Sequence, residues 1–126
     1  MAVFGFIGTG NMGGALAEAV CRRVGPESVL VSNRTREKAE KLAAELGCTV
    51  ADNRTAAQKS DFLFLGVKPQ MMREVLEDIK GALEARRGDV VLVSMAAGLT
   101  AESISDMAGG DFAVIRIMPN TPVQVG

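Results

Sequence analysis

Three glycines near the start of the chain have the spacing of a phosphate-binding turn. Gly8, Gly10 and Gly13 follow the apolar run 3–7 and open the segment 11–24, in which apolar residues recur at helical spacing. In such a turn the first glycine permits the tight change of direction, the second lets the backbone approach a pyrophosphate, and the third lets helix and strand pack closely. The free N–H groups at the start of the helix attract negative charge. Because a glycine-rich turn can also be only a turn, the prediction of a dinucleotide site depends on this context.

No carboxylate follows the second predicted strand, 28–32. NAD-binding domains usually carry an acid there to bind the ribose 2′-hydroxyl. In this chain Arg34 stands there instead, and a guanidinium can pair with a 2′-phosphate. The neighbouring candidates supply further donors or positive charge: Ser32, Asn33, Thr35, Arg36 and Lys38. The sequence therefore favours NADPH over the more weakly bound NADH, although the same cations could simply form the solvated start of a helix.

Three later turns place polar or small residues directly after predicted strands, where the ligand of a parallel sheet lies. The turns are 67–70, 94–98 and 118–122. We expect Lys68 beside the ribose and phosphates, unless it is an ordinary surface lysine. The small residues Ala96, Ala97 and Gly98 leave room for a nicotinamide ring. Two prolines bracket Asn120 and Thr121, which we expect to orient a small substrate, unless that turn is only structural.

The elements that must position these residues alternate between apolar runs and helical patterns. Strands are predicted at 3–7, 28–32, 48–51, 62–67, 90–95 and 113–118, and helices at 11–24, 36–46, 54–59, 70–84 and 101–108. Asn53 and Thr100 are predicted N-caps, and Gly47 and Gly109–Gly110 suit helix C-termini. Right-handed crossovers then give a doubly wound parallel sheet of Rossmann type, with three layers α/β/α and strand order 3-2-1-4-5-6. We expect one such domain over 1–126.

Composition excludes several classes of partner. The formal net charge is −1 over 126 residues, with no strongly basic run, so neither nucleic acid nor an acidic membrane surface is an expected partner. No apolar stretch has the length of a membrane span and no leader is evident, so the expected location is the cytoplasm by default. Cys21 and Cys48 lack metal-ligand spacing and are expected to be ordinary thiols. His, Tyr and Trp are absent, which removes the usual proton donors of carbonyl reductases.

Five motifs in this order and spacing resemble the N-terminal domain of pyrroline-5-carboxylate reductase. They are Gly8-x-Gly10-x-x-Gly13, Ser32-Asn33-Arg34, Val67-Lys68-Pro69-Gln70, Ser94–Gly98 and Met118-Pro119-Asn120-Thr121-Pro122. The resemblance implies reduction of 1-pyrroline-5-carboxylate to L-proline with NAD(P)H. It implies that residues 6–11 and Val67–Gln70 line the cofactor. Together with the patterns above, the expected cofactor site comprises Phe6, Ile7, Gly8, Thr9, Gly10, Asn11, Met12, Gly13, Ser32, Asn33, Arg34, Thr35, Asn53, Val67, Lys68, Pro69, Gln70, Ala96, Ala97, Gly98 and Asn120. Within that set, Asn53 approaches the adenosine end, and Ala97 and Asn120 lie near the nicotinamide.

Members of that family continue into a helical domain that dimerises and supplies much of the substrate site, whereas this chain ends at Gly126. We therefore expect it to bind cofactor with little or no turnover by itself, and the complete protein to be a homo-oligomer. A protonated cyclic imine needs only a well-placed hydride, so no catalytic acid or base is assigned. An apolar sixth strand at the sheet edge predicts self-association of this chain. The alternatives are a β-hydroxyacid dehydrogenase or coenzyme-reducing relative, and a non-catalytic NADPH-binding or redox-sensing module.

Overall fold

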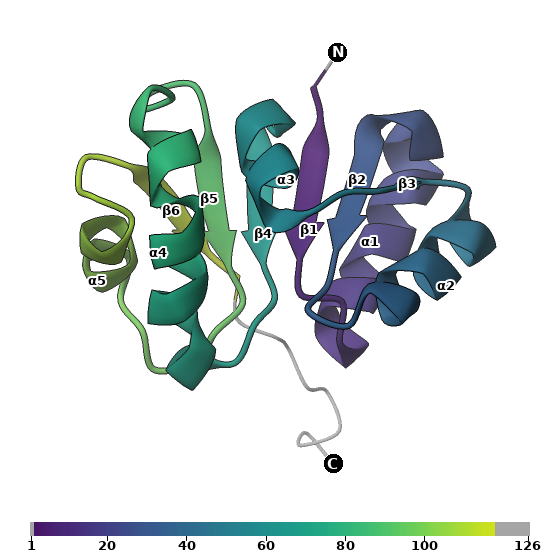
Figure 1. The fold of residues 1–126 in the computed structure, drawn as a ribbon, viewed down its shortest axis with the longest axis horizontal. Coiled ribbons are helices and arrows are strands. Elements are labelled where there is room, and N and C mark those ends of the chain that lie inside the picture. Colours follow the sequence, from purple (N-terminus) through teal and green to yellow (C-terminus); the bar gives the residue numbers. More distant parts are fainter. Residues whose placement is uncertain (1, 118–126) are drawn as a thin grey trace.

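A six-stranded parallel sheet with strand order β3-β2-β1-β4-β5-β6 forms the centre of the molecule (Figure 1). The computed structural model describes residues 2–117. The strands are β1 (Phe4–Ile7), β2 (Val29–Ser32), β3 (Thr49–Val50), β4 (Phe62–Leu65), β5 (Val91–Ser94) and β6 (Ala113–Arg116). The helices are α1 (Asn11–Val24), α2 (Arg36–Leu46), α3 (Asn53–Lys59), α4 (Pro69–Glu84) and α5 (Ala101–Met107), with a 3₁₀ turn at Pro26–Ser28. The predicted Rossmann-type α/β fold and strand order are confirmed.

Alternating side chains divide the core into two layers, one on each face of the sheet. Leu63 and Leu65 of β4 point to the face covered by α3, α4 and α5, with Leu76 and Ile79 of α4 packed against them. The opposite face belongs to α1 and α2. On that face Phe64 stacks on Phe6, with ring centroids 4.4 Å apart, as the β1–β4 register requires. A parallel sheet buried on both faces explains why the strands are almost continuously apolar.

The second face is less completely covered at β6 than at the other strands. Ile115 is paired in register with Val93 of β5, yet Ile115 is 50% exposed and Val93 is buried. Within residues 2–117, β6 is the last strand on this side of the sheet, as predicted. Self-association through this edge stays a prediction.

Several predicted boundaries need correction. Each strand is one or two residues shorter than predicted, because pairing with the neighbouring strand stops at the loops that flank it. Asn53 is not an N-cap: Asp52 caps α3 by accepting a hydrogen bond of 2.7 Å from the backbone N–H of Thr55. The cap at Thr100 and the left-handed Gly47 after α2 are confirmed. The 3₁₀ turn before β2 was not predicted.

Two further features concern the cysteines and membranes. Both cysteines are free, and burial, more than the neighbouring thiol of Cys48, raises the pKa of Cys21 to about 11. Among residues 2–117, no helix is long and apolar enough to cross a membrane.

Candidate cofactor site

The glycine turn between β1 and α1 is shaped by two contacts of the backbone with itself. Gly8 has a φ of +89°, and a Cβ there would lie 2.7 Å from the carbonyl oxygen of Gly66. A Cβ on Gly13 would collide with the carbonyl oxygen of Gly8. Gly10 differs, because a Cβ there would enter open space. The fold itself requires Gly8 and Gly13, whereas the space above Gly10 is available to a ligand.

Thr9 carries an unsatisfied hydroxyl inside this turn. Its backbone N–H donates to Oδ1 of Asn33 at 3.3 Å, but its buried Oγ1 has no hydrogen-bond partner in the described part of the chain. A buried hydroxyl left without a partner costs about 1–3 kcal/mol. A phosphate oxygen would accept a hydrogen bond from this hydroxyl, so the donors of the turn fit a dinucleotide pyrophosphate.

Side-chain hydrogen bonds tie the end of β2 to the next two elements. The hydroxyl of Ser32 donates to Oδ1 of Asn53, the first residue of α3, at 2.5 Å. The amide of Asn33 accepts from Thr9 and donates to the carbonyl of Thr35 at 3.1 Å. These bonds fix the loop that carries Arg34 relative to the glycine turn. The structure thus shows Ser32 and Asn33 as positioning residues; direct contact with a cofactor stays a prediction for both.

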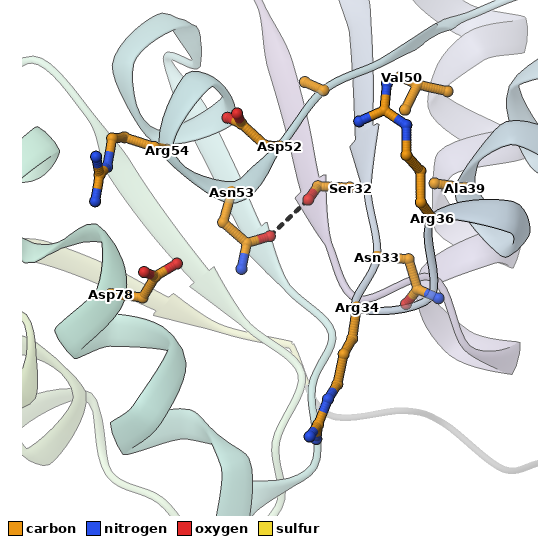
Figure 2. A pocket seen from close by; sticks show the side chains of 11 residues that line it. Ser32, Asn33, Arg34, Arg36, Ala39, Val50, Asp52, Asn53, Arg54 and Asp78 are labelled. Atoms are coloured by element: carbon orange, nitrogen blue, oxygen red, sulfur yellow. Dashed lines mark hydrogen bonds between the residues drawn. The ribbon is translucent and has the colours of Figure 1, made fainter.

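A polar cavity of about 370 Å³ opens beside the end of β2 (Figure 2). The charged residues that line it are Arg34, Arg36, Arg54, Asp52 and Asp78. Figure 2 shows Arg54 and Asp78 on the opposite side of the cavity from Arg36. The excess of positive charge suits an anion.

The three arginines differ in their partners. Arg36 is engaged by Glu40 in the same helix at 3.2 Å. Within residues 2–117, the guanidinium groups of Arg34 and Arg54 make no hydrogen bond or ion pair. The Asp52 carboxylate is already occupied as the cap of α3, and the Thr55 N–H holds its pKa below the ordinary value. Two cations are therefore left for a ligand.

A second cavity of about 430 Å³ lies between the ends of β1 and β4, where the strand order reverses. Ligands of doubly wound sheets bind at this point. Val67, Met71 and Val75 make one wall apolar, and Lys68 and Gln70 add polar groups. Both cavities share Asn33, Arg34 and Asn53, which stand between them.

The remaining predicted site residues are placed less directly. Phe6 is fully buried in the core, so only its backbone could contribute, and Pro69 begins α4 without lining either cavity. Met12 is exposed at the start of α1. Ala96 is buried, and its N–H donates to Oγ of Ser94 at 3.2 Å.

Ala97 and Gly98 follow Ala96 as exposed residues, and neither lines the two cavities. Asn120 and Thr121 lie outside the described residues. The nicotinamide end of the site stays a prediction.

Several lining residues were not predicted, among them two apolar residues of α4 and two charged residues. Met71 and Val75 are four apart on α4, and that spacing after Pro69 could have indicated a helix face turned to the site. Arg54 and Asp78 carried no signal, because a charged residue on the exposed face of a helix is the ordinary case.

Comparison with known proteins agrees with this geometry. Residues 3–98 match the family model described as NADP oxidoreductase coenzyme F420-dependent. The chain is 37% identical to pyrroline-5-carboxylate reductase of Corynebacterium melassecola over 128 residues, which cover all of this chain and 47% of the relative.

Solved structures include the pyrroline-5-carboxylate reductase of Coxiella burnetii, at 30% identity and a TM-score of 0.85, with 98% of this chain and 46% of that one covered. They also include the Plasmodium falciparum pyrroline carboxylate reductase with NADP bound, at 26% identity and a TM-score of 0.78, with 98% and 44% covered. The chain spans slightly less than half the length of these relatives. It belongs to the family of NADP oxidoreductases described as coenzyme F420-dependent, and within it resembles the N-terminal, NADP-binding domain of pyrroline-5-carboxylate reductase.

Proposed function

We propose that this chain is the cofactor-binding half of an enzyme that reduces 1-pyrroline-5-carboxylate to L-proline with NADPH. The observation that carries the proposal is the end of β2. No acid stands there, and the unpaired Arg34 lies between an arginine-lined cavity and the cavity at the strand-order reversal. An acid at this place would repel a 2′-phosphate, and a guanidinium attracts one.

Each part of the cofactor finds suitable groups along this edge. The turn at Gly8, Thr9 and Gly10 would hold the pyrophosphate, with the buried Thr9 hydroxyl donating to it. The polar cavity beside Arg34 would take the 2′-phosphate. The apolar wall of the second cavity, which includes Val67, would pack against the adenosine.

The chain contributes positioning rather than acid–base chemistry. When bound, the reduced nicotinamide supplies a hydride to the imine carbon. The small residues Ala97 and Gly98, together with Asn120, would hold that ring, and Thr121 would help orient the substrate. An imine protonated in solution needs no proton from the chain, which has neither His nor Tyr.

The substrate, the oligomeric state and the cytoplasmic location belong to the complete protein and are proposals by likeness to the relatives. The helical part implied by the resemblance would supply the groups for the substrate carboxylate and the contact between subunits. This division of labour predicts cofactor binding without substantial turnover in the present chain.

Calorimetric titration of this chain with NADPH and then NADH, at one ionic strength, tests the proposal. We expect NADPH to bind at least tenfold more tightly. Equal affinity for both would contradict the assignment of the 2′-phosphate, and binding of neither would contradict a functional cofactor half. Fusing the helical half of a relative to this chain then separates a reductase from a redox-sensing module, because a sensor would bind NADPH without reducing the imine.

A further inference from the structure

We propose that Arg54, in the first turn of α3, is a second specificity-determining residue for the 2′-phosphate. The inference rests on the proposed NADPH-binding function and adds a residue from an element that neither the glycine turn nor the β2 end contains. Arg54 lines the polar cavity on the side opposite Arg36 (Figure 2). A phosphate in that cavity would therefore have cationic groups on two sides.

The backbone of Arg54 is held in place by bonds on either side of it. Asn53 accepts the hydrogen bond from Ser32 at 2.5 Å, which ties the start of α3 to the end of β2. Asp52 caps the same turn through Thr55 at 2.7 Å. Arg54 thus projects from a fixed point relative to the β2 end, so its guanidinium needs only a side-chain rotation to meet an anion in the cavity.

The charge balance of the cavity favours a role for Arg54 over Arg36. A phosphate monoester carries nearly two negative charges at neutral pH. Arg34 supplies one free cation, while Glu40 competes for Arg36. Arg54 is exposed and makes no ion pair or hydrogen bond within residues 2–117, and its charge acts on the Asp52 carboxylate only at longer range, so no hydrogen bond or ion pair must break before it binds. It therefore supplies the second free guanidinium.

Asp78 of α4 places a negative charge on the same side of the cavity as Arg54. Its carboxylate repels a phosphate in the cavity and attracts Arg54 when the cavity holds no anion. Asp78→Asn should therefore strengthen binding of a 2′-phosphate modestly, about two- to threefold, without changing a ligand that lacks this group.

The test uses adenosine 2′,5′-bisphosphate and adenosine 5′-monophosphate, which differ only in the 2′-phosphate. Titration of Arg54→Gln should show at least fivefold weaker binding of the bisphosphate and less than twofold change for the monophosphate. Arg54→Lys should retain part of the preference. Lys59→Gln is the matched control, because it removes one positive charge from the far end of the same helix, outside the cavity. Circular dichroism should show an unchanged fold for all three variants.

An unchanged ratio of the two affinities in Arg54→Gln would overturn the role of Arg54, and so would an equal loss in Lys59→Gln, which would indicate only a general charge effect. Arg34→Gln separates these failures from failure of the proposed function. If Arg34→Gln loses the preference and Arg54→Gln keeps it, NADPH binding stands without Arg54. If the unmodified chain does not distinguish the two nucleotides, both proposals fall.

Discussion

Arginines at the amino ends of the strands form internal contacts, whereas two arginines at the carboxyl ends form none in the described part of the chain. At the amino ends of the strands, Arg86 donates to the carbonyls of Ala57 and Ser60 at 2.8 and 2.6 Å and lies 4.0 Å from Asp61. At the carboxyl ends, Arg34 and Arg54 make no such contact within residues 2–117.

The hydroxyl groups follow a related pattern. Ser60, near the amino ends, has an unsatisfied hydroxyl, but this hydroxyl is packed tightly onto Gly5 and leaves no space for a ligand. Thr9, near the carboxyl ends, has an unsatisfied hydroxyl in a turn that borders open space at Gly10. An unpaired polar group indicates a binding site where open space lies beside it. Among the described residues, both conditions are met at the carboxyl ends of the strands.

Filling the open space at Gly10 should have the largest effect on cofactor binding. Gly10→Val should weaken NADPH and NADH alike by at least 100-fold, about 2.8 kcal/mol, because the side chain would occupy the pyrophosphate path. Its φ of −72° suits any residue, so the melting temperature should change by less than about 2 °C. Calorimetry and thermal unfolding measure both effects. Gly13→Val should instead unfold the domain, and a Gly10→Val variant that still binds would remove Gly10 from the site.

Arg86→Leu tests the structural role of the arginine at the amino ends of the strands. The substitution leaves the part-buried carbonyls of Ala57 and Ser60 without their charged donor, so the free energy of unfolding should fall by about 2 kcal/mol. The ratio of NADPH to NADH affinity should not change. Urea unfolding of the variant, with Arg73→Leu as the control on the exposed face of α4, provides the measurement. A shift in cofactor preference would show that contacts at the amino ends of the strands also influence binding at their carboxyl ends.

Arg34→Glu tests the proposed binding role of the arginine at the carboxyl ends of the strands. A carboxylate in place of the guanidinium should reduce NADPH affinity by at least tenfold, about 1.4 kcal/mol, and NADH affinity much less. Stability should be almost unchanged, because Arg34 is exposed and makes no internal bond within the described chain. An equal loss for both cofactors in calorimetric titration would argue against a 2′-phosphate at this position.

Asp52 gives the smallest expected effect, and it depends on pH. The Thr55 N–H lowers the pKa of Asp52 in the folded state, so its stabilising effect is present above the ordinary value of 3.8 and is lost as pH falls through the lower folded value. Asn also caps helices, so Asp52→Asn isolates the charge. The variant should be slightly less stable at pH 7, with the gap narrowing as pH falls below 3.8 in urea unfolding. A constant gap would show that the charge contributes nothing.

Much of the fold was predictable because local patterns and topology agreed. Apolar runs separated by helical periodicity predicted all six strands, and right-handed crossovers then fixed their order. The N-cap of α3 was not predictable, since Asp52 and Asn53 are both good caps and stand side by side. A bond from Ser32, distant in the chain, recruits the Asn53 side chain and leaves Asp52 as the cap.

The sequence alone determined the sheet order, the glycine turn and the absence of an acid after the second strand. These features depend on residue type, local backbone preference and apolar periodicity, which act over a few neighbouring residues. Only the tertiary structure decided which cations stay free. Arg54 and Arg86 look alike in the sequence, but folding carries Arg86 to two carbonyl oxygens and Arg54 to the wall of a cavity. Whether a charged side chain finds a partner depends on which distant segments of the chain the fold places next to it.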